Sequence, residues 1–255
     1  PAYLNLILLI FSSVFLYGGG VVLNDVFDFE IDQIERPERP IPKGEVSLKG
    51  AALFGSGLLL SGVFLSFFVN HLSGIIAVIL ALTILLYDSY SKKYQFLGPL
   101  NMGLCRALNL ILGMSVFGEI FHWMYAVIPI LYIFAITLIS RGEVYGQNIK
   151  HIIWAGLIYA MVIFIVLMII PDIRTQWIGL FPFMGLFIFL IYRPLIRAYR
   201  VNSPDNIKKA VVSGVLSIIV LDASLTVGFD GWQFGLIVLL LLPLSFILAK
   251  IFAVT

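Results

Sequence analysis

Long apolar segments follow one another along almost the whole chain, and they constrain its fold more than any other feature. A helix needs about 20 predominantly apolar residues to cross a bilayer, and nine stretches approach that length. They lack the period of two that is typical of barrel strands. Of the 255 residues, 61% are hydrophobic and 12% are charged, against about 45–50% and about 25% in soluble domains. The sequence therefore predicts an all-α, polytopic membrane helical bundle.

About nine transmembrane helices are expected, and we treat residues 1–255 as a single domain. The narrowest separation is the polar turn Pro171-Asp172-Ile173-Arg174, which divides the sixth span from the seventh. The first span begins almost at once after Pro1, so we expect that a preceding N-terminal helix is missing. The expected spans are Ala2–Leu23, Leu48–Val69, Leu72–Tyr87, Gly98–Phe117, Trp123–Ile139, Ile152–Ile170, Trp177–Tyr199, Ile207–Thr226 and Trp232–Phe252.

The basic residues are distributed unevenly between the loops. Of the 16 Lys and Arg residues, 14 lie after or at the end of odd-numbered spans. The positive-inside rule assigns these loops to the cytoplasm. We therefore expect a multi-pass protein of the cytoplasmic (inner) membrane whose chemistry-bearing loops share the cytoplasmic face. The net charge of +2 is too small to imply a nucleic-acid partner, and the single cysteine, Cys105, excludes an intrachain disulfide and a thiolate metal site.

A run of acidic residues, Asn24 to Asp32, begins where the first apolar segment ends. Asp25, Asp28 and Asp32 are spaced i, i+3 and i+7, which places three carboxylates on one face of a helix. Such a cluster repels itself unless a cation lies before it, and carboxylate oxygens without His or Cys favour Mg²⁺. The alternative is a solvated acidic helix end. The position at a membrane boundary favours a metal site and phosphate chemistry on a lipid.

A proline-rich basic loop, Arg36 to Gly44, follows directly. It presents Arg39 and Lys43 just beyond the aspartates, and an arginine offers a planar fork for phosphate oxygens. Ordinary positive-inside anchoring is the alternative. Because the loop adjoins the acidic run, we interpret Arg39 as part of a diphosphate clamp.

Two further polar segments end the third and fifth spans. In Tyr87 to Lys93, Lys92 could reach phosphates and Tyr87 could stabilise a developing cation. In Ser140 to Asn148, Glu143 and Gln147 share a helix face, which fits a second metal-binding edge or, equally well, a polar helix cap.

Charged residues also occur inside the expected spans. Arg106, with Asn109 three residues later, forms a polar stripe in the fourth span, and Asp222 is a candidate partner in the eighth. An ionisable residue at the centre of a membrane helix costs about 2.5–3.5 kcal/mol on insertion scales. Two interpretations of Arg106 and Asp222 are open: contact with substrate, or a buried structural ion pair. The run Gly18-Gly19-Gly20 lies within the first span, where small residues allow close helix packing.

At these motifs the chain resembles the UbiA superfamily of intramembrane prenyltransferases. The superfamily's first motif, Asn-Asp-x-x-Asp-x-x-x-Asp, is filled by Asn24, Asp25, Asp28 and Asp32, and the Arg39 to Pro42 and Tyr87 to Lys92 segments also match. Within it, the chain resembles the UbiA-like proteins called EboC. That likeness rests on residues 105–110, 140–144 and 248–255.

The resemblance implies a helical bundle around a central cavity. It also implies Mg²⁺-dependent transfer of a polyprenyl group from a polyprenyl diphosphate to an unidentified small acceptor. The predicted metal ligands are Asn24, Asp25, Asp28, Asp32 and Glu143. The predicted catalytic residues are Asp28, Asp32, Lys92 and Tyr87. The predicted substrate-binding residues are Asn24, Arg39, Lys43, Arg106 and Asn109.

The sequence departs from this family at two points. The second acidic motif usually has two aspartates four residues apart, whereas this chain has Glu143 and Gln147. The family also commonly has nine helices, and nine are already expected here before any missing one. The first departure motivates a rival hypothesis, in which the protein binds or transports a prenyl lipid and keeps the fold without catalysing transfer.

Overall fold

The computed structural model describes residues 2–142, 146, 148–170 and 173–251, and all regular structure among them is helical. These residues form two compact units, Pro1–Ile133 and Phe134–Thr255. The boundary falls within helix α6 (Val127–Ser140). Whether the two units act as a single domain stays a prediction.

The expected all-α membrane architecture is confirmed. Eight of the described helices are long and apolar enough to cross a membrane, and each overlaps one of the first eight expected spans. Large apolar side chains remain exposed along these helices, for example Leu53, Phe64 and Ile178. Such surfaces suit a lipid surrounding and would be a liability in water.

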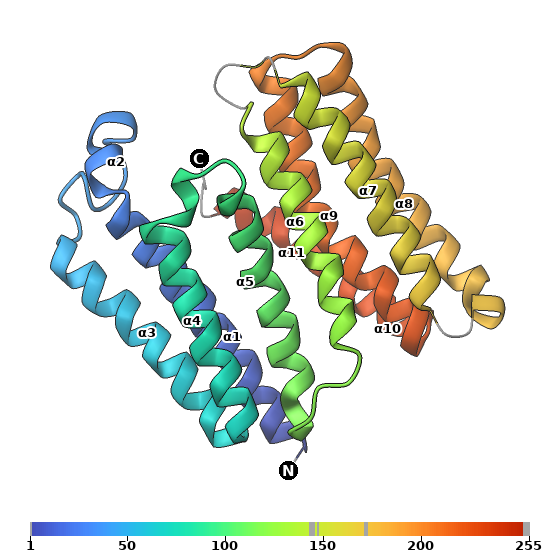
Figure 1. The fold of residues 1–255 in the computed structure, drawn as a ribbon, viewed down its shortest axis with the longest axis horizontal. Coiled ribbons are helices and arrows are strands. Elements are labelled where there is room, and N and C mark those ends of the chain that lie inside the picture. The colour runs from blue at the N-terminus through green and yellow to red at the C-terminus, as the bar shows by residue number, and fades with distance from the viewer. Residues whose placement is uncertain (1, 143–145, 147, 171–172, 252–255) are drawn as a thin grey trace. The chain divides into compact units, whose positions relative to one another are not determined.

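The first unit is an up-and-down arrangement of α1 (Ala2–Phe27), α3 (Leu48–Val69), α4 (His71–Ser89) and α5 (Leu97–Met114). The short helix α2 (Phe29–Glu35) follows α1, and 3₁₀ turns cover Ser91–Lys93, Ser115–Phe117 and Trp123–Ala126. Its core consists of Leu9, Leu16, Leu23, Leu59, Ile76, Ala77, Leu80 and Leu112. The end of α1, α2, the start of α3, the end of α4 and the start of α5 all lie at one end of this unit (Figure 1).

Helices α1 and α3 make the most extensive contact in the first unit. A Cβ atom on Gly19 would lie 2.8 Å from the carbonyl oxygen of Gly55, so a side chain there would force the helices apart. Ser12 donates a hydrogen bond of 2.7 Å to the carbonyl of Gly62 across the same interface. The predicted role of the glycine run in close helix packing is thus confirmed.

The second unit contains the rest of α6, then α7 (Ile149–Ile169), α8 (Ile173–Arg200), α9 (Pro204–Asp230), α10 (Trp232–Leu239) and α11 (Leu241–Ile251). Helices α7 and α8 run in opposite directions, which confirms the division of the sixth span from the seventh (Figure 1). Tyr192 of α8 donates a hydrogen bond of 2.8 Å to the carbonyl of Gly156 on α7. The backbone N–H of Asn148 donates to the side chain of Asn202 at 2.9 Å, which ties the loop before α7 to the one after α8.

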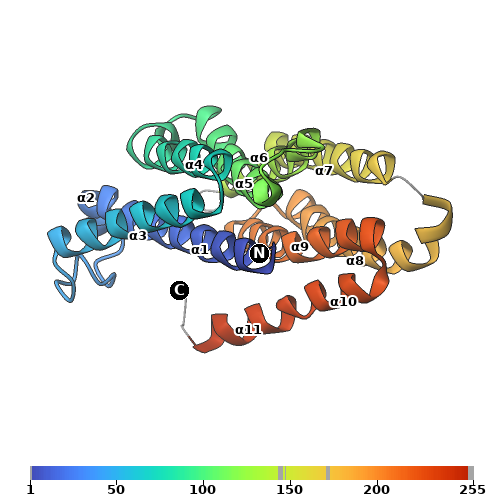
Figure 2. The same ribbon diagram turned by 90° about the horizontal axis from the view of Figure 1, so that it is seen from below.

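The ninth expected span, Trp232–Phe252, is not one continuous helix in its described part. Figure 2 shows α10 and α11 following one another end to end. They have 8 and 11 residues, so at 1.5 Å per residue neither crosses about 30 Å alone. The break follows Leu239, four residues before Pro243. The proline ring clashes with the carbonyl of the fourth preceding residue and has no N–H to bond it.

Candidate functional site

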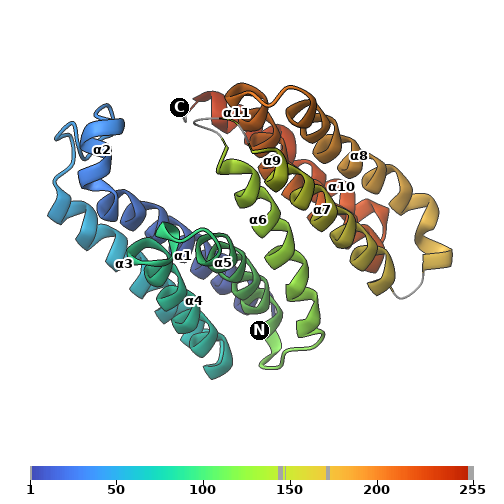
Figure 3. The same ribbon diagram turned by 45° about the horizontal axis from the view of Figure 1, so that its top comes forward.

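The aspartate run spans the junction between α1 and α2, and the helical hydrogen-bond pattern continues through it. The backbone N–H of Asp28 donates to the carbonyl of Asn24 at 2.9 Å, and that of Asp32 donates to Asp28 at 2.8 Å. Asp25, Asp28 and Asp32 therefore share one face, as the spacing predicts. Asp32 is buried, whereas the opposite face exposes Phe27, Ile31 and Ile34. Figure 3 shows α2 at the end of α1, beside the start of α3.

Arg39 lies between two of these aspartates. Its Nη1 atom is 2.8 Å from Oδ1 of Asp25 and 2.7 Å from Oδ2 of Asp32. The loop folds back to achieve this, with the N–H of Arg39 donating to the carbonyl of Arg36 and Gly44 turning the chain at a φ of +81°. A positive φ is readily adopted by glycine because it has no Cβ. The structure thus brings the predicted diphosphate-binding arginine to the predicted metal ligands.

Lys92 reaches the remaining aspartate from another part of the chain. Its Nζ atom is 2.6 Å from Oδ1 of Asp28. The 3₁₀ turn that carries Lys92 is anchored by a hydrogen bond of 2.9 Å from Asn101 to the Ser91 hydroxyl. A Cβ on Gly98 would lie 3.2 Å from the Ser91 carbonyl, so glycine lets α5 approach this turn closely.

A fourth carboxylate, Asp88, was not among the predicted site residues. It lies near the end of α4, is 3% exposed, and accepts a hydrogen bond of 2.8 Å from Nδ2 of Asn24 through its Oδ1 atom. Its other oxygen, Oδ2, is buried and has no hydrogen-bond partner among the described residues. The available signal was its place between Tyr87 and Lys92 at the end of an apolar helix.

The donor set at this end of the first unit is chemically suited to Mg²⁺. Carboxylate and carboxamide oxygens are its usual protein ligands, and the unpartnered Oδ2 of Asp88 adds a buried one. In the arrangement observed, however, no three His, Cys, Asp or Glu side chains of the described residues are grouped to hold a metal. Arg39 and Lys92 neutralise the aspartates instead. A metal ion would therefore compete with these two side chains.

Lys43 pairs with Glu45 and not with the aspartate run. Lys43 is exposed, and the hydrogen bond from Lys43 to the Glu45 carboxylate raises the pKa of Lys43 above its ordinary value. Tyr87 is half-buried on α4, next to Asp88. The predicted roles of both residues stay predictions.

The polar stripe within α5 is split between two environments. Asn109 accepts a hydrogen bond of 2.6 Å from the Ser13 hydroxyl on α1, whereas Arg106 is exposed. Asp222, its candidate partner, belongs to the second unit, and that pairing stays a prediction. Glu143 and Gln147, the predicted second acidic motif, lie outside the described residues.

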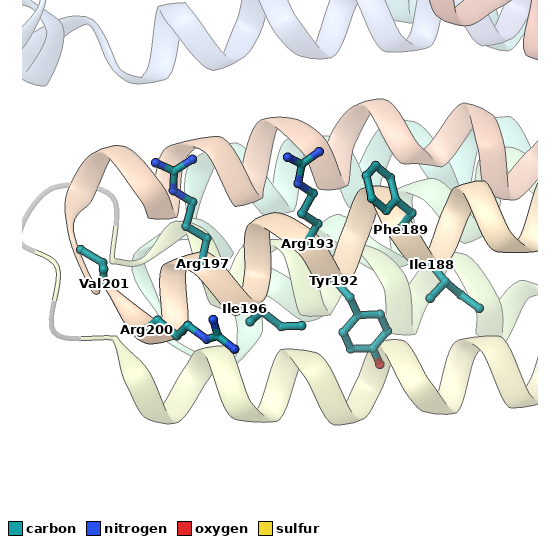
Figure 4. A pocket seen from close by; sticks show the side chains of 8 residues that line it. All are labelled: Ile188, Phe189, Tyr192, Arg193, Ile196, Arg197, Arg200 and Val201. Atoms are coloured by element: carbon teal, nitrogen blue, oxygen red, sulfur yellow. The ribbon is translucent and has the colours of Figure 1, made fainter.

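A separate basic groove lies on α8 in the second unit. Its volume is about 570 Å³, and three arginine side chains project beside apolar ones in Figure 4. The guanidinium group of Arg193 stacks 5.2 Å from the ring centroid of Phe189. The groove is lined by Ile188, Phe189, Tyr192, Arg193, Ile196, Arg197, Arg200 and Val201. The sequence predicted these arginines only as residues of a cytoplasmic loop.

The fold and the site together define the class of protein: a multi-spanning helical membrane protein that gathers carboxylates and cations at one end of its first helices. The chain belongs to the UbiA prenyltransferase family, whose model matches residues 1–211. The match extends across both compact units. The family resemblance read from the motifs is thereby confirmed, whereas the likeness to EboC stays a prediction.

Several curated relatives are digeranylgeranylglyceryl phosphate synthases. The one from Methanococcoides burtonii is 43% identical over 111 residues, which are 43% of this chain and 40% of the relative. The one from Saccharolobus solfataricus is 37% identical over 125 residues, 48% of this chain and 44% of the relative. The matched part of the chain thus spans about two fifths of the length of these relatives.

One solved structure has a similar fold. It is described as giving structural and mechanistic insights into the biosynthesis of digeranylgeranylglyceryl phosphate synthase in membranes. The TM-score is 0.64 at 24% identity, over 87% of this chain and 84% of the other. At this identity the likeness supports the fold alone.

Proposed function

We propose that this protein transfers a polyprenyl group from a polyprenyl diphosphate to a small acceptor, with Mg²⁺ as cofactor. The observation that carries the proposal is the grouping of Asp25, Asp28 and Asp32 with Arg39 and Lys92 at one end of the first unit. Carboxylates for a metal and cations for phosphate oxygens are the two components that diphosphate binding needs. Membership of the UbiA prenyltransferase family supports the same chemistry.

The proposed roles follow from the contacts. Asn24, Asp25, Asp28 and Asp32 would hold the metal, with Glu143 as a further proposed ligand. Arg39 and Lys92 now bind carboxylates, and they would exchange these for oxygens of the diphosphate. Bound Mg²⁺ would neutralise the leaving pyrophosphate.

The chain's own residues would then favour ionisation of the donor. Arg39 and Lys92 stabilise the negative charge that develops on pyrophosphate as the C–O bond breaks. Tyr87 is proposed to stabilise the allylic cation through its ring. The acceptor's nucleophilic atom forms the new bond to the allylic carbon, and its proton is released together with pyrophosphate. Lys43, Arg106 and Asn109 are proposed to contribute to substrate binding.

The names of the relatives suggest a specific acceptor for this proposal. A digeranylgeranylglyceryl phosphate carries two geranylgeranyl groups on glyceryl phosphate. We propose geranylgeranyl diphosphate as donor and a glyceryl phosphate that bears one geranylgeranyl group as acceptor. A cytoplasmic-membrane location, a site facing the cytoplasm and action of residues 1–255 as a single domain belong to the same proposal, as does the likeness to EboC.

The test is an assay of the purified protein with these two substrates and Mg²⁺. We expect a doubly prenylated glyceryl phosphate and an equal amount of pyrophosphate, both lost on chelation of the metal. Chain length and acceptor are then varied one at a time. Product formation that persists after chelation would contradict the metal-dependent mechanism.

A second candidate is binding or transport of a prenyl lipid without turnover. The engagement of all three aspartates by basic side chains favours it, as does Gln147 in the second acidic motif. In this case the protein would bind geranylgeranyl diphosphate tightly but release no pyrophosphate, even when candidate acceptors are present.

A further inference from the structure

Asp88 is a buried acid for which the sequence motifs provide no role. Its side chain lies on α4, 64 residues from Asn24 in sequence, yet Oδ1 of Asp88 accepts the Asn24 amide hydrogen at 2.8 Å. It is also near enough to Asp25, Asp28 and Lys92 to interact with them electrostatically. Asp88 thus lies beside the aspartate run, through its contact with Asn24, while coming from a different helix.

The contacts of Asp88 leave half of its carboxylate unused. No basic side chain of the described residues forms an ion pair with it, because Lys92 pairs with Asp28 and Arg39 with Asp25 and Asp32. Its Oδ2 atom is buried without a hydrogen-bond partner among the described residues. A buried polar atom of this kind is unfavourable unless something binds it. A cation that enters the cluster would supply that partner.

The hydrogen bond to Asn24 has a second consequence. Because the amide nitrogen of Asn24 is engaged by Asp88, the orientation of the carboxamide is set and its carbonyl oxygen remains available as a ligand. Groups that orient metal ligands in this way typically contribute 10–100-fold to metal affinity.

We propose that Asp88 completes the cation site: its Oδ2 atom is a further oxygen ligand for Mg²⁺, and its Oδ1 atom orients Asn24. The proposal rests on the proposed function. Asp88, on α4, would then be the fourth carboxylate of the site, after Asp25, Asp28 and Asp32. The second acidic motif of this chain has only one acid, Glu143.

The test measures metal binding in the purified full chain without prenyl substrates. Mn²⁺ replaces Mg²⁺, and free Mn²⁺ is followed by electron paramagnetic resonance. Asp88→Asn keeps the size of the side chain and the acceptor for Asn24. We expect it to weaken Mn²⁺ binding by about 10-fold or more, while the melting temperature without metal stays at or above the wild-type value. Asp205→Asn removes an exposed acid in the first turn of α9 and is the control, with unchanged affinity.

The outcomes separate this inference from the proposed function. Wild-type Mn²⁺ affinity in Asp88→Asn, together with weakened binding in Asp28→Asn, would overturn the role of Asp88 alone. Unchanged binding in both variants would overturn the metal site as a whole. If Asp88→Asn does not fold, Asp88→Ser replaces it, because serine removes the carboxylate and keeps a small polar side chain. Unchanged Mn²⁺ affinity in Asp88→Ser would also overturn the inference.

Discussion

Two groups of basic residues in this protein have opposite surroundings. In the first unit, Arg39 and Lys92 lie within 2.8 Å of aspartate oxygens. On α8 of the second unit, Arg193, Arg197 and Arg200 lie along a groove. None of the three forms an ion pair with another described residue. Both groups lie near or beyond the ends of apolar helices, where basic residues are common in membrane proteins. The two groups differ in their acidic partners and not in the number of cations. Basic residues with aspartate partners form a candidate site, whereas basic residues without them form a surface suited to anionic lipid.

The two groups should also differ in how much their ion pairs contribute to stability. The ion pairs of the first group are partly buried, so removing one partner leaves a poorly solvated charge and is destabilising, though less than for a fully buried pair. An exposed cation contributes about 0–1 kcal/mol even when it is paired. Substitutions in the first group should therefore alter both stability and activity, whereas those in the second should alter neither substantially.

The largest effect is expected for Asp28→Asn. The substitution removes a proposed metal ligand and the partner of Lys92, so we expect product formation to fall by about 10²–10³-fold, the range for loss of a key electrostatic contact. The assay is pyrophosphate release at saturating donor, with Asp205→Asn as the control of unchanged activity. Full activity in Asp28→Asn would show that the aspartate partners of Arg39 and Lys92 are not needed for function, and the two groups of basic residues would then not differ in role.

Lys92→Met should reduce stability as well as activity. Asp28 would lose its counter-ion in a partly exposed setting, and we expect a loss of about 1–3 kcal/mol, below the value for fully buried pairs. Denaturation of the detergent-solubilised protein measures it. The double variant Lys92→Met/Asp28→Asn should recover part of the stability but no activity. A double variant as unstable as the sum of the single ones would show that the pair is not coupled.

Arg39→Gln should separate metal binding from donor binding. The guanidinium group now occupies the space between Asp25 and Asp32, so its removal should tighten Mn²⁺ binding in the absence of substrate. Because the diphosphate loses a charged partner, KM for the donor should rise by about 10-fold. A change of both affinities in the same direction would contradict the view that Arg39 competes with the metal.

Arg197→Gln on α8 should have the smallest effect. Its side chain is exposed and has no ion pair among the described residues, so we expect stability within about 0.5 kcal/mol of the wild type. Activity should change less than about twofold in neutral detergent. A large loss of activity would show that the arginine groove takes part in function, and the two groups would then no longer differ in role.

Local regularities could be recognised in the sequence because they depend on near neighbours. The apolar lengths predicted eight of the membrane-spanning helices, and the i, i+3, i+7 spacing predicted the shared face of Asp25, Asp28 and Asp32. The ninth span was predicted as one continuous helix, whereas the structure has two shorter ones. Its apolar character is evident, but Pro243 interrupts the helix at the carbonyl of Leu239.

The membrane class, the family and the acidic face can all be recognised from sequence, because each depends on composition or on a short, ordered pattern. Which cations contact the aspartates depends on tertiary packing, which brings Lys92 to Asp28 and leaves Lys43 with Glu45. Tertiary packing also brings Asp88 to Asn24 from another helix. Contacts of this kind arise from the packing of α1 against α4, which fixes the side chains that face each other and is not encoded in any local spacing.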